Sequence, residues 1–407
     1  MDRRSGARRW RDPKRYAWPL ALLVPALPFA GFAVWWATGG VGWAWWIAPV
    51  VVFGAIPAVD VLLGDDPRNP PEEVAGRLQR VRYYRWITYL YLPAQYAGLA
   101  LCCAVWVRGD LGVVGVAGLV LTTGIVNGIA INTAHELGHK REAVERWLSK
   151  VALAPTGYGH FYVEHNRGHH VRVATPEDPA SARLGESFWA FWPRTVLGSL
   201  VSAWRLETAR FRLRSRTPWT WRNNVLNAWA MTAVLVGGLV AAFGVRVLPF
   251  LLLQAVVGFS LLEVVNYLEH YGLRRQRNAA GRYEKVDPRH SWNSDRVVTN
   301  VFLFQLQRHS DHHANPLRRY QTLRSFDQSP QLPAGYATMV VTALVTPLWR
   351  RLMDPRVVAH YGGDLSLANL HPPATRRLRA RYGRSSTLDA ATRRPSTSGI
   401  ATPAPGP

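Results

Sequence analysis

The chain has 407 residues, and its 49 Lys and Arg against 26 Asp and Glu give a formal net charge of +23. This length suits two or three soluble domains or one membrane domain that crosses the bilayer several times. Four long stretches contain no Asp, Glu, Lys or Arg, namely 16–59, 86–107, 111–135 and 223–245. Because a soluble surface needs charge throughout, these gaps exclude a soluble protein and predict an integral membrane protein.

The predicted membrane spans follow from the length of the apolar stretches. A helix that crosses about 30 Å of hydrocarbon needs roughly 20 mostly apolar residues. Six segments meet this requirement: 17–38, 41–63, 86–107, 111–134, 225–245 and 247–268. Very short turns join them in pairs, at Gly39-Gly40, at Arg108 to Asp110 and around Gly244. The predicted fold class is therefore all-α, a polytopic membrane protein with six transmembrane helices.

Basic residues gather outside these spans. They lie in the N-terminal arm, the 64–85 loop, the 135–224 segment and the region after residue 269. Because cytoplasmic loops of membrane proteins are enriched in Lys and Arg, we expect these segments and both termini to face the cytoplasm of a bacterial-type inner membrane. This multi-pass topology accounts for the positive charge, so no nucleic-acid partner is expected.

The chain divides into a basic cytoplasmic arm at 1–16, one membrane domain at 17–382 and a tail at 383–407. The tail is rich in Ser, Thr, Pro, Ala and Arg, a composition typical of disorder. The stretch from Tyr336 to Trp349 is apolar but too short to span a bilayer. We expect it to form a helix in the cytoplasm or at the membrane interface.

Histidine is the most informative residue type of the sequence. Nine of the 13 histidines fall in four short motifs, all on the predicted cytoplasmic side. Residues i and i+4 share one helix face, so His135 and His139 can bind one metal ion. In the motifs that begin at His165 and His309, the first imidazole shares a face with one of the later pair. The adjacent histidine then points sideways, towards a second metal ion.

The residue type also restricts the metal. Neutral imidazole binds iron, copper, nickel and zinc, and it is a poor ligand for magnesium and calcium. Nine imidazoles exceed what one ion can hold, so two ions are predicted. The candidate ligands are His135, His139, His165, His169, His170, His270, His309, His312 and His313.

Two other classes of protein share parts of this pattern. The HELGH motif at 135–139 is also typical of zinc peptidases, in which the Glu is the general base. A membrane zinc peptidase would leave seven of the nine histidines unexplained. A metal transporter would need ionisable residues near the middle of its spans, whereas here they gather at one end.

Together, the motifs resemble the eight-histidine signature of membrane di-iron desaturases and hydroxylases. More narrowly, HELGHK, EHNRGHH, NYLEHYG and LQRHSDHH resemble the alkane 1-monooxygenases, as do NPPEE at 69–73, ATPEDPASAR at 174–183 and HSWNS at 290–294. A fatty-acid desaturase or another membrane di-iron hydroxylase is the alternative that shares the eight-histidine core. The His270 motif and the flanking stretches favour the alkane family.

The resemblance implies that the nine histidines hold two iron ions. It also implies terminal hydroxylation of medium- to long-chain n-alkanes to primary alcohols with O2 and two electrons from rubredoxin. An unactivated C–H bond offers neither an acidic proton nor a leaving group, so a redox cofactor has to carry this reaction. An alkane is found in the bilayer, so we expect the site to open towards membrane lipid.

The electron donor is expected to be a separate chain. A rubredoxin domain needs four cysteines, whereas the only two cysteines here, Cys102 and Cys103, lie inside the third predicted span. The donor itself would be reduced by an NAD(P)H-dependent flavin rubredoxin reductase.

Acidic residues near the ligands are candidates for orienting an imidazole or for binding metal. Glu263 lies seven residues before His270 within the sixth span, where the alternative is a polar contact between helices. The other candidates adjoin ligands in the sequence, although residues next to each other on a helix also point apart. They are Glu136, Glu164, Glu269 and Asp311.

Val52 and Ile56 are candidates for the wall of an alkane channel. They lie one helical turn apart near the cytoplasmic end of the second span. The alternative is that Val52 faces lipid. If Val52 lines the channel, its small side chain leaves room for alkanes longer than roughly a dozen carbons.

Overall fold

Helices make up the regular secondary structure of residues 10–383, the part of the chain that the computed structural model describes. β-Pairing within those residues is limited to four isolated bridges. Six segments are long and apolar enough to cross a membrane: Trp18–Ala37, Gly42–Leu63, Arg82–Arg108, Val113–Gly138, Asn224–Phe243 and Val245–His270. The predicted all-α architecture with six spans is confirmed. The start of the predicted basic arm and the predicted disordered tail from residue 384 lie outside the described residues.

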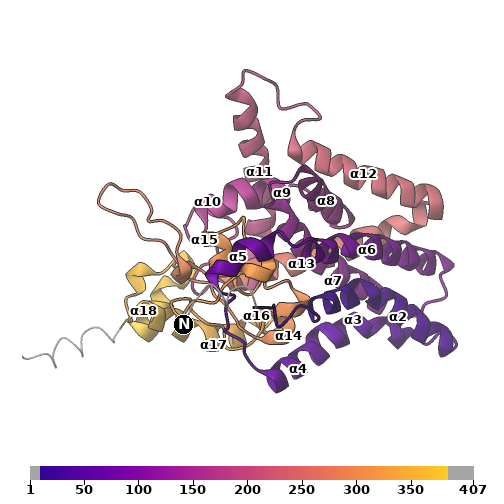
Figure 1. Ribbon diagram of the computed structural model, residues 1–407, viewed down its shortest axis with the longest axis horizontal. Coiled ribbons are helices and arrows are strands. Elements are labelled where there is room, and N and C mark those ends of the chain that lie inside the picture. The colour runs from indigo at the N-terminus through magenta and orange to yellow at the C-terminus, as the bar shows by residue number, and fades with distance from the viewer. Residues whose placement is uncertain (1–9, 384–407) are drawn as a thin grey trace, which may run out of the picture.

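The spans are built from helices that run side by side in the right half of Figure 1. The first span contains the 3-10 helix η1 (Trp18–Leu22) and α2 (Leu23–Ala37). The second contains η2 (Gly42–Trp46), α3 (Ile47–Val50), the π-helix η3 (Val51–Ala55) and α4 (Ile56–Leu63). The others are α6 (Arg82–Arg108), α7 (Val113–Gly138), α12 (Asn224–Phe243), and η6 (Val245–Val247) with α13 (Leu248–His270).

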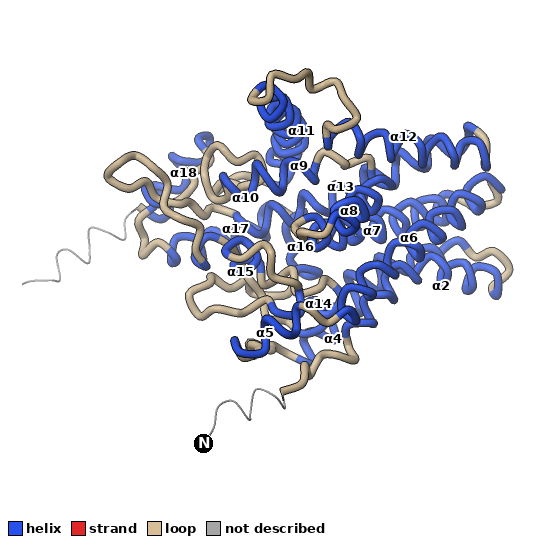
Figure 2. The backbone as a smooth tube through the Cα atoms, turned by 45° about the horizontal axis from the view of Figure 1, so that its top comes forward, coloured by secondary structure: helices blue, strands red, loops and turns tan. Residues whose placement is uncertain are grey.

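The bundle has two unlike ends. At the hairpin end, three tight turns join the spans, and Gly39, Gly109 and Gly244 adopt positive φ angles that other residues rarely accept. At the opposite end, which we call the histidine end, α7 and α13 terminate and the remaining helices gather, as Figure 2 shows. They are α5 (Glu72–Gln79), α8 (Ala143–Leu153), α9 (Phe161–Val163), the π-helix η5 (Glu164–His169), α10 (His170–Arg172), α11 (Phe188–Arg212), α14 (Val297–Phe302), α15 (His309–Ala314), α16 (Tyr336–Leu344), α17 (Thr346–His360) and α18 (Thr375–Tyr382).

Glycine lets α7 and α13 pack closely. A methyl group at Gly128 would lie 2.8 Å from the carbonyl oxygen of Gly258, and one at Gly124 would lie 2.5 Å from the Val257 side chain. Small residues at such positions allow two spanning helices to approach each other. Because α7 carries His135 and α13 carries His270 near their ends, this contact brings two of the four histidine motifs together.

Buried amides tie three spans to each other. Gln95 Nε2 donates to Asn127 Oδ1 at 3.0 Å, and Asn127 Nδ2 donates to Gln254 Oε1 at 2.8 Å. Gln254 Nε2 in turn donates to the carbonyl oxygen of Pro155 at 2.7 Å. A buried amide without a partner costs free energy, so these bonds fix the relative heights of α6, α7 and α13.

The apolar stretch from Tyr336 to Trp349 forms two helices where one was predicted. Val345 adopts φ −100° and ψ 85°, which ends α16, and Pro347 lies in the first turn of α17. A proline has no N–H to donate, so it suits the start of a new helix. Tyr336, Met339 and Val340 pack in one buried apolar cluster with Tyr267 of α13. The stretch therefore covers the histidine end of the sixth span.

Candidate metal centre

All nine predicted ligands meet in two adjoining groups at the histidine end. The five-histidine group contains His135, His139, His165, His170 and His312, and the four-histidine group contains His169, His270, His309 and His313. Within each group, the ring nitrogen atoms that could bind metal all lie within 4.8 Å of one another. The end of α7, the segment η5–α10, the end of α13 and α15 each contribute ligands. Segments up to 178 residues apart in the sequence thus converge on one site.

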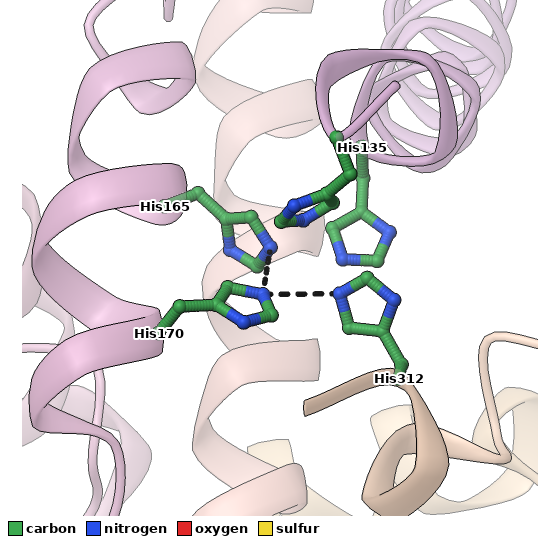
Figure 3. Close-up of side chains that lie close together, drawn as sticks. His135, His165, His170 and His312 are labelled. Carbon is green, nitrogen blue, oxygen red and sulfur yellow. Dashed lines mark hydrogen bonds between the residues drawn. The ribbon is translucent and has the colours of Figure 1, made fainter. Parts of the chain in front are cut away.

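A π-helix decides how the second motif is divided. In η5 the turn is wider than in an α-helix, so side chains five apart share a face. His165 and His170 accordingly point together, with their Nε2 atoms 3.0 Å apart, as Figure 3 shows. His169 belongs to the other group, where its Nε2 atom lies 3.2 Å from that of His313. The spacing of the motif alone left this division open.

The fourth motif is divided by ordinary α-helical geometry. His309 and His313 are one turn apart on α15, and their Nε2 atoms lie 2.8 Å apart. His312 points to the five-histidine group, where its Nε2 atom lies 3.1 Å from that of His170 (Figure 3). Both longer motifs therefore send ligands to both groups, as the sequence predicted.

The donor atoms fit a metal ion. The Nε2 atoms of His135, His139 and His270 are buried and have no hydrogen-bond partner among the described residues. A buried polar atom without a partner is costly, and metal coordination would satisfy these lone pairs. Burial also lowers the pKa of the imidazoles outside the spans, which keeps them in the neutral form that binds metal. They are His139, His165, His170, His309, His312 and His313.

The rear nitrogen atoms of two ligands in the four-histidine group have fixed partners. His169 Nδ1 lies 2.9 Å from Asp178 Oδ2, and His270 Nδ1 lies 3.2 Å from the carbonyl oxygen of His290. Each contact places the ring proton on Nδ1 and leaves Nε2 free to bind metal, since a carbonyl or carboxylate oxygen accepts. Sequence reasoning missed both partners. The available signal was that Asp178 and His290 lie within two stretches that carried the family resemblance, 174–183 and 290–294.

Asp178 is held in its charged form and in place. Burial alone would raise the pKa of its carboxyl, but His169 and the Ser181 hydroxyl hold that pKa below its ordinary value. Ser181 Oγ donates to Asp178 Oδ2 at 2.6 Å, and the backbone N–H of Ala180 donates to Oδ1 at 3.2 Å. A carboxylate fixed in this way orients the His169 ring.

Glu269 is the predicted carboxylate that lies beside the metal-binding atoms. Its Oε2 atom is 3.2 Å from Nε2 of His309, and its Oε1 atom is buried without a hydrogen-bond partner among the described residues. Because Nε2 of His309 is also the atom directed at the four-histidine group, the Glu269 carboxylate is placed to bind a metal there.

The other predicted acidic residues bind polar groups away from the imidazoles. Glu136 pairs with Lys140 Nζ at 3.0 Å, and Glu164 accepts from Arg172 Nη2 at 2.6 Å. Asp311 pairs with Arg318 at 3.0 Å. Glu263 accepts hydrogen bonds from Tyr158, Thr195 and Asn266 at 2.7, 2.8 and 3.1 Å. These four carboxylates hold together the elements that carry the ligands.

An apolar cavity leads from the spans to the histidines. It ends on His135, His165, His309 and Glu269. Val52 and Ile56 line it, together with Phe53 on the same π-helical stretch of the second span. Ile129 of α7, Leu262 of α13, Phe302 of α14 and Val340 of α16 complete much of its wall. The cavity thus touches ligands of both groups.

Comparison with known proteins places the chain in a family. The Fatty acid desaturase family model matches residues 111–343. The chain is 43% identical to the alkane 1-monooxygenase of Acinetobacter baylyi over 385 residues, which cover 91% of this chain and 92% of that protein. It belongs to the alkane 1-monooxygenase family. Other members of the family are the alkane 1-monooxygenase of Ectopseudomonas oleovorans, 44% identical with 92% and 93% covered, and that of Pseudomonas putida, 46% identical with 87% and 88% covered.

Membership in the alkane 1-monooxygenase family confirms the predicted resemblance. The match extends over most of the chain and includes all four histidine motifs, which lie between residues 135 and 313. It decides against the zinc peptidase and the metal transporter, because neither would share the sequence of these enzymes throughout its length.

Proposed function

We propose that the protein hydroxylates the terminal methyl group of medium- to long-chain n-alkanes, using O2 and two electrons from rubredoxin. The observation that carries this proposal is the apolar cavity that ends on His135, His165 and His309. An alkane has no polar group to bind, so its position has to be fixed by the shape of an apolar channel. Two iron ions held by the nine histidines would supply the redox chemistry that an unactivated C–H bond requires.

The protein's own residues would bind the metal ions, orient the imidazole rings and keep water out of the site. The nine imidazoles would hold the metal ions, and Asp178 and the His290 carbonyl keep two of the rings in the binding orientation. The cavity wall admits an alkane and excludes water, because its lining is almost entirely apolar away from the ligands. A chain that enters end-on presents its terminal methyl group to the histidines.

The electron donor would approach the metal centre at the ligands that reach the protein surface. His139 and His170 are the two ligands that are partly exposed, and their ring centroids lie 4.5 Å apart. Val171, which follows His170, is 64% exposed. Lys140, which follows His139, donates a hydrogen bond to the backbone carbonyl oxygen of Arg318. Exposed ligands on a chain with a formal net charge of +23 suit an acidic rubredoxin, reduced in turn by an NAD(P)H-dependent flavin reductase.

The same proposal includes the orientation in the membrane. The hairpin end carries Arg108 and Arg246, whereas the histidine end carries the basic arm and the Arg-rich segment from 135 to 224. Under the positive-inside rule, the histidine end faces the cytoplasm of a bacterial-type inner membrane, with both termini on that side. The electron donor is then a cytoplasmic protein.

The proposal is tested with the purified full chain in lipid nanodiscs, supplied with rubredoxin, its reductase and isotopically labelled O2. A series of n-alkanes should yield 1-alkanols that carry the label, from protein containing two irons per chain. Alkenes formed from fatty-acyl substrates, without any alkanol, would assign the chain to desaturation. Absence of alkane oxidation by protein with both irons bound would refute the proposal.

A further inference from the structure

A groove separates α11 from the segment 172–183, beside the metal centre. It holds about 1250 Å³ of atom-free space, and four arginines and two exposed apolar side chains line much of it. These residues are Arg172, Arg183, Arg194, Arg205, Leu197 and Val201. None of these side chains lines the alkane cavity, and only Arg172 touches the metal-centre residues described above, through its ion pair with Glu164.

The groove lies at the level of the membrane surface. In Figure 1, α11 runs across the direction of the spans, as a helix lying along the membrane would. Trp192 Nε1 donates to Ser260 Oγ at 2.9 Å, and Thr195 Oγ1 donates to Glu263 Oε2 at 2.8 Å. Ser260 lies ten residues before the end of the sixth span, or about 15 Å along the helix. The first half of α11 is therefore set into the outer part of the bilayer at the histidine end.

The groove side of α11 exposes apolar side chains that suit an acyl chain. Leu197 is 62% exposed and Val201 is 45% exposed. They lie four residues apart, so they follow each other along one face, and Arg205 continues that face by one further turn. An apolar floor that ends in a cation matches a molecule with a fatty chain and an anionic head.

The charges of the groove leave two cations without a partner. Arg172 pairs with Glu164 at 2.6 Å, and Arg194 pairs with Glu186 at 2.9 Å. The guanidinium groups of Arg183 and Arg205, in contrast, form no hydrogen bond or ion pair with a described residue, and the carboxylate that attracts Arg183, that of Glu186, is already paired with Arg194. Of the acidic residues that line the groove, Asp178 is committed to His169 and Glu177 to Arg277. The groove is therefore positive where a headgroup would lie.

We propose that this groove binds an anionic phospholipid, with its phosphate near Arg205 and Arg183 and an acyl chain along Leu197 and Val201. Basic pockets at the cytoplasmic level of a membrane protein are typical binding places for anionic headgroups. The exposed leucine and valine favour a lipid over a soluble anion, and the depth of α11 favours a lipid over a protein partner.

A bound lipid would also stabilise the segment 172–183, which lies beside the metal centre. The segment 172–183 carries Asp178, which orients His169, and it begins two residues after His170. It packs tightly on α11, because a methyl group at Gly198 would lie 2.7 Å from Cβ of Pro179. A lipid wedged between α11 and this segment holds both in place, so metal retention should increase. This second consequence rests on the proposed function, whereas lipid binding does not.

Native mass spectrometry of the full chain, released from detergent micelles, tests the binding. The probes are phosphatidylglycerol and phosphatidylcholine with identical acyl chains. The wild-type protein should retain phosphatidylglycerol in preference to phosphatidylcholine. The double variant R183E/R205E should lose about tenfold or more of that preference, since each basic residue near an anionic headgroup contributes substantially. The matched control is R351E/R376E, which reverses two exposed arginines of α17 and α18 and gives the same net charge.

Several results would overturn the proposal. They are equal retention of the two lipids by the wild-type protein, or an equal loss in R183E/R205E and in the control. The variant L197S/V201S keeps the arginines and removes the apolar floor, so it should also lose the lipid. If it retained the lipid fully, the groove would be a site for a free anion. A raised KM for rubredoxin in R183E/R205E with unchanged lipid binding would make the groove a protein docking site.

A second measurement separates this inference from the proposed activity. The thermal unfolding temperature of the wild-type protein should be higher in phosphatidylglycerol nanodiscs than in phosphatidylcholine nanodiscs, and R183E/R205E should lose this difference. Lipid retention and the unfolding temperature do not depend on turnover. They therefore test lipid binding whether or not the protein oxidises alkanes.

Discussion

The two histidine groups lie side by side but have different surroundings. The five-histidine group includes His139 and His170, which are partly exposed. The four-histidine group is fully buried, and two carboxylates contact its ligands, Asp178 at His169 and Glu269 at His309. The two groups therefore differ in their exposure and in their contacts with carboxylates. The five-histidine group reaches the protein surface, whereas the four-histidine group is enclosed and contacts two carboxylates.

Removing one ligand from each group should have the largest effect. We expect His270→Ala and His312→Ala each to reduce alkane turnover by about 100-fold or more, because the loss of a ligand exceeds the 10- to 100-fold effects of removing its supporting groups. Metal content per chain and 1-alkanol formation are the measurements. His360→Ala, outside both groups, serves as the control. Near-normal turnover and two irons in His270→Ala would remove that residue from the ligand set.

Removing a supporting carboxylate should weaken the buried group selectively. We expect Asp178→Asn to lower the affinity for metal by about 10- to 100-fold, because the amide no longer stabilises the Nδ1 proton of His169 as a carboxylate does. The rate of iron loss to a chelator measures this effect, and one iron should leave faster than the other. Glu177→Gln, next in the sequence but exposed, should behave like the wild type. Equal loss of both irons would show that the two groups are not supported separately.

Filling the alkane cavity should change the substrate without changing the metal. We expect Val52→Trp to shift the product profile towards shorter alkanes, by about tenfold in relative kcat/KM, since a filled pocket rejects only substrates that no longer fit. Products of an alkane series are quantified by gas chromatography, with iron content measured in parallel. Val50→Trp is a matched control on the same span, because Val50 is 63% exposed. An unchanged profile in Val52→Trp would place the limiting residue elsewhere in the cavity.

Raising the salt concentration should have the smallest effect on turnover. We expect this effect to arise from docking of the donor near the five-histidine group. Complementary charge mainly accelerates association, and salt screens it over about 8 Å at physiological ionic strength. At limiting rubredoxin, turnover should therefore fall about two- to fivefold between low and high salt. At saturating rubredoxin, turnover should be nearly constant. A flat response in both regimes would indicate an apolar docking surface or a different donor.

Several features of the fold follow from the sequence with little ambiguity. Uncharged stretches of about 20 residues have few alternatives to spanning helices, so the six spans were predictable. The ends of the spans were less predictable from the sequence. The third span begins at Arg82, four residues before the predicted start, because a helix continues past the edge of the hydrocarbon wherever packing supports it. The division of Tyr336–Trp349 into α16 and α17 has a local signal in Pro347, whereas the packing of α16 on α13 has none.

The sequence by itself determined which residues come together at the candidate metal centre, and the tertiary structure decided how they are divided between its two groups. Nine histidines in four motifs are a chemical signal, because imidazoles cluster in this way where metal is bound. Their division into five and four depends on the π-helix η5, which pairs His165 with His170 and sends His169 to the other group. Asp178 and Glu269 acquire their places only when the segment 172–183 and the end of α13 pack around α15. The spacing of residues shows which side chains share a helix face only if the type of helix is known. The type of helix and the contacts between segments are set by packing.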